Sequence, residues 1–442
     1  MDKAGRKIIL VHGSFSPAKT AKAFPDLPWL YFDRDNSGLA AWEGVLGAGL
    51  KVDYKEDLTK ASYGLRDEFV EWSARLGKPH WDKWYWWVTG LATRSNVTSN
   101  FYLYVCYIEV LKEVLAKNGG DIIIVSNSRE LLDIIGLNWK GRSVIVKPCY
   151  LEDLLKRILR YLKVRARPVY YWSRFFKRSF SEWAAARWTR FRFGRKAEHV
   201  YDKDHVVINT YVNDECMGGE FRDKYFPGLS QHLAGKGMKV STLIQIFYLK
   251  DRTFSQALKW FRKSKESFLI PQDYYNLWDC FGSFLTVIKS SRFTFPRESC
   301  YFRGIYIRPL IDMEQREQSQ DTWLADFINQ MKMFGNWKKL RYGLKIYIDT
   351  WELKKGEVPA LVAIQKYFPS CRTIAYQHAA LIPKLLFFNF KTTPEEFDAS
   401  PHADIGIANS RVTKEFLLKE GFPGSFVRLG RALRYKWWEK YA

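Results

Sequence analysis

Short apolar runs that end in polar residues dominate the last hundred residues of this chain. They occupy positions 346–348, 373–376, 405–408 and 426–429. Runs this short and this apolar are typical of parallel strands that are buried on both faces of a sheet. Two longer runs, 205–212 and 239–247, flank a helical stretch at 225–234 that ends near Gly235 and Gly237. This order of strand, loop, helix and strand predicts the opening of a Rossmann-like α/β domain.

The first third of the chain shows the same alternation of strand and helix. Strands are predicted at 7–11, 30–33, 121–125 and 143–147. The stretch 100–115 has its apolar positions on one helical face, with Glu109 and Lys112 opposite. The string SNSRELLDIIG between the last two of these strands predicts a capped helix that ends at Gly136. We therefore expect residues 1–150 to form one small α/β domain.

The stretch 251–340 is expected to be mostly helical. Its apolar residues Leu258, Phe261 and Phe268 have the spacing of a packed core rather than of a site. We interpret it as a helical insertion. The predicted organisation is an N-terminal α/β domain at 1–150, a basic aromatic segment at 151–204, and a Rossmann-like α/β domain at 205–442 that contains the insertion.

Charge and aromatic content change this picture. The chain of 442 residues carries a formal net charge of +23, and 17% of its residues are aromatic, including 18 Trp. Its 47% of hydrophobic residues excludes a disordered chain. A chain this basic is expected to meet an anionic partner, which would be nucleic acid, a phospholipid surface or a phosphorylated substrate.

The cysteine pattern and the apolar runs indicate a compartment. The six cysteines are scattered without any CxxC pair, which argues against a disulfide framework and a zinc site. The apolar run before His12 is too short for a signal peptide, and no stretch of about 18 apolar residues could span a membrane. We expect a cytoplasmic protein that is soluble or lies on a membrane surface.

Positive charge is concentrated in the segment 151–196. After Asp153 its only acidic residue is Glu182, and Arg and Lys alternate with Trp, Phe and Tyr. Pro168 is expected to divide the segment into two helices. Three interpretations compete: a linker or core-covering hairpin, a single-stranded nucleic-acid site with stacking aromatics, and a helical pair on an anionic membrane. We favour the membrane, because no nucleic-acid recognition motif is present.

On the membrane interpretation, aromatic residues enter the acyl boundary and basic residues meet the headgroups. The predicted contact residues are Arg160, Trp172, Arg174, Phe176, Lys177, Trp183, Trp188 and Arg190.

Candidate chemistry lies at the ends of the predicted strands, because ligands of open α/β sheets bind outside the carboxyl ends of the strands. The polar residues at these ends are Asp349, Glu352, Gln377, His378, Asn409, Ser410, Arg431 and Arg434. Asp214 lies in the loop after the strand at 205–212. No HExxH or similar metal-binding spacing occurs, so neither a metal nor another cofactor is expected.

Each candidate has a plainer alternative. Asp349 or Glu352 could act as a general base in a dry cleft, but Glu352 could equally be a first-turn helix residue favoured by the helix dipole. His378 could orient a phosphate or a sugar hydroxyl, or it could be a satisfied buried histidine. Arg431 and Arg434 could pair with a diphosphate, or simply precede a basic tail.

The chain resembles a family on several of these strings. IDTWE, RTIAYQHAALIP, ADIGIANS and VRLGRALR are similar to bacterial surface-carbohydrate biosynthesis proteins, which are glycosyltransferase-like proteins of lipopolysaccharide, O-antigen and capsule assembly. Weaker similarity extends to INTYVNDE and WWVTGLATRSNVTSN. The resemblance implies a GT-B fold, in which two facing Rossmann-like domains hold a nucleotide-sugar. It also implies sugar transfer to a lipid-linked glycan at the inner face of the cytoplasmic membrane.

The resemblance also implies roles for single residues. Glu352 matches the strand-end acid of the family, Gln377 and His378 match its QH pair, and Gly430 and Arg434 lie in its turn. Glu352 or Asp214 would be the base or would stabilise an oxocarbenium-like transition state, whereas His378 and Arg434 would hold the donor phosphates. Because the matched turn lies so near Ala442, we expect the C-terminal donor domain to be incomplete.

Two functions remain open from the sequence. The first is a membrane-surface glycosyltransferase whose partners are a nucleotide-sugar, a lipid-linked glycan acceptor and an anionic membrane, with nucleic acid unlikely to be among them. The second is a non-catalytic basic protein that binds a membrane surface or nucleic acid.

Overall fold

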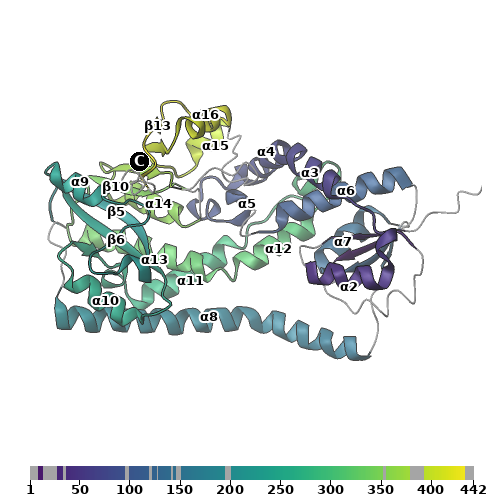
Figure 1. The fold of residues 1–442 in the computed structure, drawn as a ribbon, viewed down its shortest axis with the longest axis horizontal. Helices are drawn as coiled ribbons and strands as arrows, with labels where there is room; N and C mark the ends of the chain where they lie inside the picture. The colour runs from purple at the N-terminus through teal and green to yellow at the C-terminus, as the bar shows by residue number, and fades with distance from the viewer. Residues whose placement is uncertain are drawn as a thin grey trace, which may run out of the picture. The chain divides into compact units, whose positions relative to one another are not determined.

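The chain folds into two compact units in the computed structural model (Figure 1). The structure describes residues 8–12, 27–32, 36–94, 99–118, 122–126, 128–140, 143–145, 151–194, 201–351, 355–378 and 393–433. Unit 1 contains Met1–Leu76, Asn96–Arg167 and Thr294–Glu317. Unit 2 contains Gly77–Ser95, Pro168–Phe293 and Gln318–Ala442.

Unit 1 is built on a four-stranded parallel sheet in the order β2-β1-β3-β4. Its strands are β1 (Ile8–His12), β2 (Trp29–Tyr31), β3 (Ile122–Ser126) and β4 (Ser143–Ile145). The buried side chains of Ile9, Trp29 and Ile123 pack with Trp42 from a neighbouring helix. The predicted α/β character of the N-terminal region is therefore confirmed for the described residues.

Helices and a short hairpin complete unit 1. They are α2 (Asn36–Leu46), α3 (Lys55–Gly64), α4 (Arg66–Gly77), α6 (Phe101–Asn118), α7 (Arg129–Asn138), β8 (Tyr301–Phe302), β9 (Ile305–Tyr306) and α12 (Arg308–Gln318). The predicted capped helix is α7, and its cap is Ser128, whose side chain accepts a hydrogen bond from the backbone N–H of Leu131. The predicted end at Gly136 is wrong. The helix continues because a glycine inside a helix costs only about 1 kcal/mol relative to alanine.

Unit 2 contains a seven-stranded parallel sheet in the order β13-β12-β11-β10-β5-β6-β7. Its strands are β5 (His205–Asn213), β6 (Lys239–Tyr248), β7 (Phe268–Leu269), β10 (Ile346–Thr350), β11 (Arg372–Tyr376), β12 (Ile405–Ala408) and β13 (Val427–Leu429). The chain first builds outward from β5 to β7 and then returns to place β10 beside β5. All the strands predicted in this half are confirmed, and the sheet is compatible with a Rossmann-like fold.

Helices cover both faces of this sheet (Figure 1). They are α9 (Leu229–Gly235), α10 (Phe254–Lys263), α11 (Leu277–Ser290), α13 (Thr322–Lys339), α14 (Glu357–Tyr367), α15 (Pro394–Ala399) and α16 (Arg411–Lys419). Val207 packs with Phe334 and Trp337 of α13, whereas its neighbour Val206 lies in a separate cluster with residues of α9. Side chains alternate across a strand, so this division shows that β5 is buried on both sides.

The basic aromatic segment forms one helix, α8 (Leu151–Phe193). The predicted break at Pro168 is wrong, because Pro168 lies inside the helix. An internal proline costs about 3 kcal/mol through its missing N–H and a clash with the preceding turn. The turns that follow are held by packing, since Trp172 and Phe175 are buried in a cluster with Leu324 and Ile328 of α13.

The compact units do not follow the predicted boundaries at 150 and 204. Residues from Pro168 onward belong to unit 2, because one face of this part of α8 is buried against it. Leu258, Phe261 and Phe268 are core residues as predicted. The interpretation of 251–340 as an insertion is not supported in full, since β7 within it is a strand of the main sheet and 294–317 belongs to unit 1.

Candidate functional site

The order of the sheet in unit 2 defines a topological switch point between β5 and β10. Asp349 lies there, 4% exposed, and both of its carboxylate oxygens accept hydrogen bonds. Asn209 Nδ2 and the backbone N–H of Thr350 donate to Oδ1 at 3.0 and 2.7 Å, and the Tyr347 hydroxyl donates to Oδ2 at 2.9 Å. Gln245 Nε2 of β6 donates to Asn209 Oδ1 at 3.2 Å. A chain of polar side chains therefore crosses three neighbouring strands.

Burial changes the acidity of these groups. Burial raises the pKa of Asp349 to about 6, although the hydrogen bonds from Asn209 and Tyr347 oppose this rise. Burial, followed by the charge of Asp349, raises the pKa of the Tyr211 and Tyr347 hydroxyls well above 10. Asp349 therefore changes its protonation close to neutral pH in a fixed geometry, while the two tyrosines stay neutral.

Gln377 and His378 extend this site on the neighbouring strand. Gln377 is 2% exposed, and its Oε1 accepts a hydrogen bond from the backbone N–H of Asn409 at 3.4 Å. The His378 ring lies edge-on to the ring of Tyr225 at 4.5 Å, and Tyr225 in turn lies 5.7 Å from Tyr211. The structure thus joins His378 to the switch point through a row of aromatic rings.

The predicted residues on the outer strands have local partners. Ser410 caps α16 by accepting a hydrogen bond from the Thr413 backbone N–H at 3.1 Å, and the Thr413 hydroxyl donates to Asn409 Oδ1 at 3.2 Å. At Gly430 a Cβ atom would lie 2.3 Å from Ile407 Cγ2, so only glycine fits there. The exposed Arg431 offers its backbone carbonyl to the Tyr376 hydroxyl.

Asp214 joins the end of β5 to the loop after β6. Its Oδ2 accepts hydrogen bonds from the backbone N–H groups of Lys250 and Asp251, the latter at 3.0 Å, and Arg252 Nη1 lies 3.6 Å from Oδ1. The hydrogen bond from Asp251, with the neighbouring contacts from Lys250 and Arg252, holds the pKa of Asp214 below its usual range. Asp214 is therefore ionised at neutral pH and fastens this loop.

Three of the predicted site residues fall outside what the structure describes. Glu352 and Arg434 lie outside the described residues, and the side chain of Arg160 does too.

The predicted membrane-contact residues of α8 fall on different faces of the helix. The prediction that Trp172 contacts a membrane is wrong, because the residue is 6% exposed and its Nε1 donates a hydrogen bond to the Ser319 carbonyl at 3.0 Å. Phe176 is half-buried against the same cluster, with its ring 5.8 Å from that of Phe284. Trp183 and Arg190 are also half-buried.

The remaining predicted contacts do face outward. Arg174 and Lys177 are exposed, and Trp188 is 59% exposed. The sequence analysis missed other exposed aromatic residues of this helix, notably Phe191, which is 87% exposed. A mixed basic and aromatic face therefore remains uncovered within the described part of unit 2.

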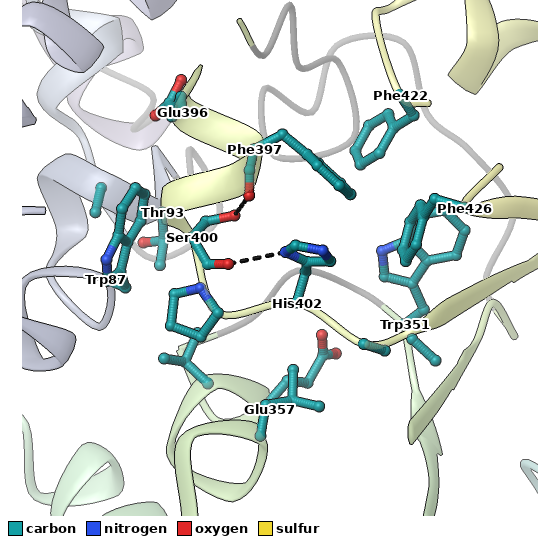
Figure 2. Close-up of a pocket in the computed structure, with 16 residues that line it drawn as sticks. Trp87, Thr93, Trp351, Glu357, Glu396, Phe397, Ser400, His402, Phe422 and Phe426 are labelled. Carbon is teal, nitrogen blue, oxygen red and sulfur yellow. Dashed lines mark hydrogen bonds between the residues drawn. The ribbon is translucent and has the colours of Figure 1, made fainter. Parts of the chain in front are cut away.

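Unit 2 also contains an aromatic cavity of about 110 Å³ on the other half of the sheet (Figure 2). Figure 2 shows the rings of Phe397 and Phe426 around His402, whose Nδ1 lies 2.8 Å from the Ser400 carbonyl oxygen. Seven of the sixteen lining residues belong to one hydrophobic core cluster. Glu396 at its edge forms a buried ion pair with Arg94. This cavity is therefore continuous with part of the core.

Sequence reasoning missed Asn209, Tyr211, Tyr225 and Gln245 at the switch point. The only signal for Asn209 is a polar residue inside the apolar run of β5, and it gains meaning only when β10 brings Asp349 beside it.

Among the described residues, no group of three or more His, Cys, Asp or Glu side chains is arranged to hold a metal ion. None of the described helices is both long enough and apolar enough to cross a membrane.

Comparison with known proteins gives no relative for this chain: no family model matches it, and neither the curated proteins nor the solved structures contain a match.

Proposed function

We propose that this protein is a glycosyltransferase that moves a sugar from a nucleotide-sugar to a lipid-linked surface glycan, with its donor at the switch point. One observation carries the proposal: the parallel sheet reverses its strand order between β5 and β10, and a buried polar network centred on Asp349 lies there. In open α/β sheets this is the place where nucleotide-containing ligands bind. The resemblance to surface-carbohydrate biosynthesis proteins supports the same chemistry.

Within this proposal each residue has its own role. Asp349 holds Asn209 and Tyr347 in position beneath the donor site, and His378 contacts the donor from the loop after β11. Glu352 acts as the base. The pKa of Asp214 is lowered, so its carboxylate is a weak base and is better suited to stabilising positive charge than to taking a proton. Arg434 contacts the donor phosphates.

The exposed face of α8 is proposed to place the enzyme on an anionic membrane. Arg174 and Lys177 would contact lipid headgroups, and Trp188 and Phe191 would enter the acyl boundary. A lipid-linked acceptor requires such proximity.

The proposal is tested by thermal unfolding with UDP-, GDP-, CDP- and dTDP-sugars. At a hundred times its Kd, a donor that binds only the folded state stabilises it by about 2.7 kcal/mol. We expect one nucleotide class to raise the Tm, and His378→Ala to weaken its binding at least tenfold. His402→Ala, in the aromatic cavity, is the matched control and should bind normally. A protein that no nucleotide-sugar stabilises, or a His378→Ala variant that binds like the wild type, would contradict the proposal.

A non-catalytic role in binding membranes or nucleic acid is the second candidate, favoured by the exposed basic and aromatic face of α8. It predicts binding to anionic vesicles or single-stranded nucleic acid that weakens steeply with salt, together with no response to any nucleotide-sugar.

A further inference from the structure

A second cavity of unit 2 lies at the carboxyl end of β6, on the side of the sheet covered by α8 and α13. Its volume is about 260 Å³. We call it the polar cavity. It is lined by Arg178, Glu182, Tyr211, Gln245, Tyr275, Phe247, Trp323, Asp326 and Gln330, among others. The sequence analysis treated the helical residues of this set as a membrane face or as packing.

Charged side chains from two helices meet in the polar cavity. Arg178 of α8 forms an ion pair with Asp326 of α13, and its Nε lies 3.8 Å from Glu182 Oε1. Gln272 Nε2 donates to the other oxygen of Glu182 at 3.3 Å. Two carboxylates and one guanidinium give this wall a formal charge of −1, whereas the whole chain carries +23. An anionic ligand is therefore disfavoured here.

One buried polar group in the cavity wall has no partner. Gln330 is 3% exposed, and its Oε1 accepts no hydrogen bond from any described residue. A buried acceptor without a partner costs about 1–3 kcal/mol. Asn329, its neighbour on α13, is equally buried but accepts a hydrogen bond from the Ser283 hydroxyl at 2.7 Å. Gln330 therefore belongs to the cavity wall, but its unused oxygen is covered by the protein and does not itself contact a ligand.

Aromatic rings form the other wall. Phe247 and Trp323 are 58% and 49% exposed, and their ring centroids lie 5.1 Å apart. Large exposed apolar groups beside hydrogen-bonding groups are typical of ligand sites rather than of free surface. The flat faces of the two rings suit a flat, weakly polar surface of a ligand.

We propose that the polar cavity binds a neutral sugar ring. The hydroxyl groups of a sugar can donate to Asp326 and Glu182 and accept from Arg178, while its C–H face packs on Trp323 and Phe247. The cavity volume is close to the lower limit of about 300 Å³ for small-molecule sites, which fits one ring and not a nucleotide. This site adjoins the proposed donor site and shares Tyr211 and Gln245 with it, but the groups proposed to bind the sugar are separate from those proposed for the donor.

The acidities of the cavity fit an uncharged ligand. Burial raises the pKa of Asp326 to about 7, against the opposing charge of Arg178. Burial also raises the pKa of Glu182. Asp326 is partly protonated at neutral pH, so the cavity carries less negative charge than its two carboxylates indicate. A cationic ligand such as an amine is therefore attracted only weakly.

The test is saturation-transfer NMR and calorimetry on the full chain with glucose, galactose and N-acetylglucosamine. We expect millimolar binding of at least one of them, and much weaker binding of glucose 1-phosphate. Trp323→Ala and Arg178→Met should each weaken binding at least tenfold. Trp278→Ala is the matched control, because Trp278 is 82% exposed on α11 and does not line the cavity, and it should bind normally.

Four results would overturn the proposal: no saturation transfer to any neutral sugar, preferential binding of choline, glucose 1-phosphate binding as tightly as glucose, or unchanged binding by both cavity variants. His378→Ala separates the two proposals, since it should abolish the response to nucleotide-sugars and leave neutral-sugar binding unchanged. Failure at one site would not imply failure at the other.

Discussion

The two cavities of unit 2 are both lined by aromatic rings, yet their charged residues differ. In the aromatic cavity, the side chains of Arg94 and Glu396 are 1% and 6% exposed and pair with each other. In the polar cavity, the side chains of Arg178 and Asp326 are 41% and 35% exposed and share their surroundings with Glu182 and the free Gln330 acceptor. The first ion pair is enclosed in the core, whereas the second is open to solvent. Access to the charged groups, and not the presence of aromatic walls, distinguishes the two cavities.

The largest expected effect contrasts the two ion pairs. Arg94→Met leaves the buried Glu396 carboxylate without its cation, so we expect the free energy of unfolding to fall by about 3–5 kcal/mol. Arg178→Met should cost less than about 1 kcal/mol, because that pair is open to solvent. Urea unfolding measures both.

A double variant provides the control. Arg94→Met combined with Glu396→Leu removes both charges and should recover most of the lost stability. Equal losses for Arg94→Met and Arg178→Met would remove the distinction between the two cavities.

An intermediate effect contrasts two neighbours on α13. Asn329→Leu breaks a buried hydrogen bond to the Ser283 hydroxyl and should destabilise the protein by about 1–3 kcal/mol. Gln330→Leu removes an acceptor that has no partner among the described residues, so stability should stay constant or rise by about 1 kcal/mol. Chemical denaturation of the two variants side by side checks this. A destabilised Gln330→Leu variant would mean that the amide is already satisfied.

The smallest expected effect is a dependence on pH in the polar cavity. The folded-state pKa of Asp326 is about 7, above its ordinary value of 3.8, with Arg178, Glu182, Asp321 and Tyr275 acting on it. The folded state therefore binds the proton more tightly, and this contribution is complete below pH 3.8 and is lost as the pH rises through 7. Because about a third of the side chain is exposed, we expect less than about 1 kcal/mol.

Asp326→Asn is the variant that isolates this contribution. The difference in unfolding free energy between wild type and variant should decline from pH 4 to pH 7, as measured by urea titrations at fixed ionic strength. A constant difference would show that Asp326 titrates normally.

The sequence predicts the framework of unit 2 well and its sites only in part. The apolar runs of β10 to β13 gave correct strands because strands buried on both faces leave a strong signal. Asp349 and His378 were chosen as candidates because polar residues after such runs stand out. Other polar residues after the strands have local roles, such as the helix cap made by Ser410. The sequence alone does not distinguish such a cap from a ligand contact.

The polar cavity could not be predicted, for a physical reason. Arg178 lies in a basic helix and Asp326 lies 148 positions away in a stretch with a core-like pattern. Neither position is unusual within its own helix. Only the packing of α8 against α13 brings them together. Trp172 is buried in that packing, whereas the sequence predicts it to lie at a membrane surface.

The central pairing of the large sheet has a consequence for how the protein folds. Asn209 and Asp349, which meet across β5 and β10, are 140 positions apart. Joining such distant strands requires the closure of a long loop. The chain loses conformational entropy in closing this loop before the contact stabilises it, so parallel pairings of this kind form slowly. The half-sheets β5-β6-β7 and β10-β11-β12-β13 can each form from nearer segments. We therefore expect the switch point to assemble late in folding, so that only a completed fold binds a ligand there.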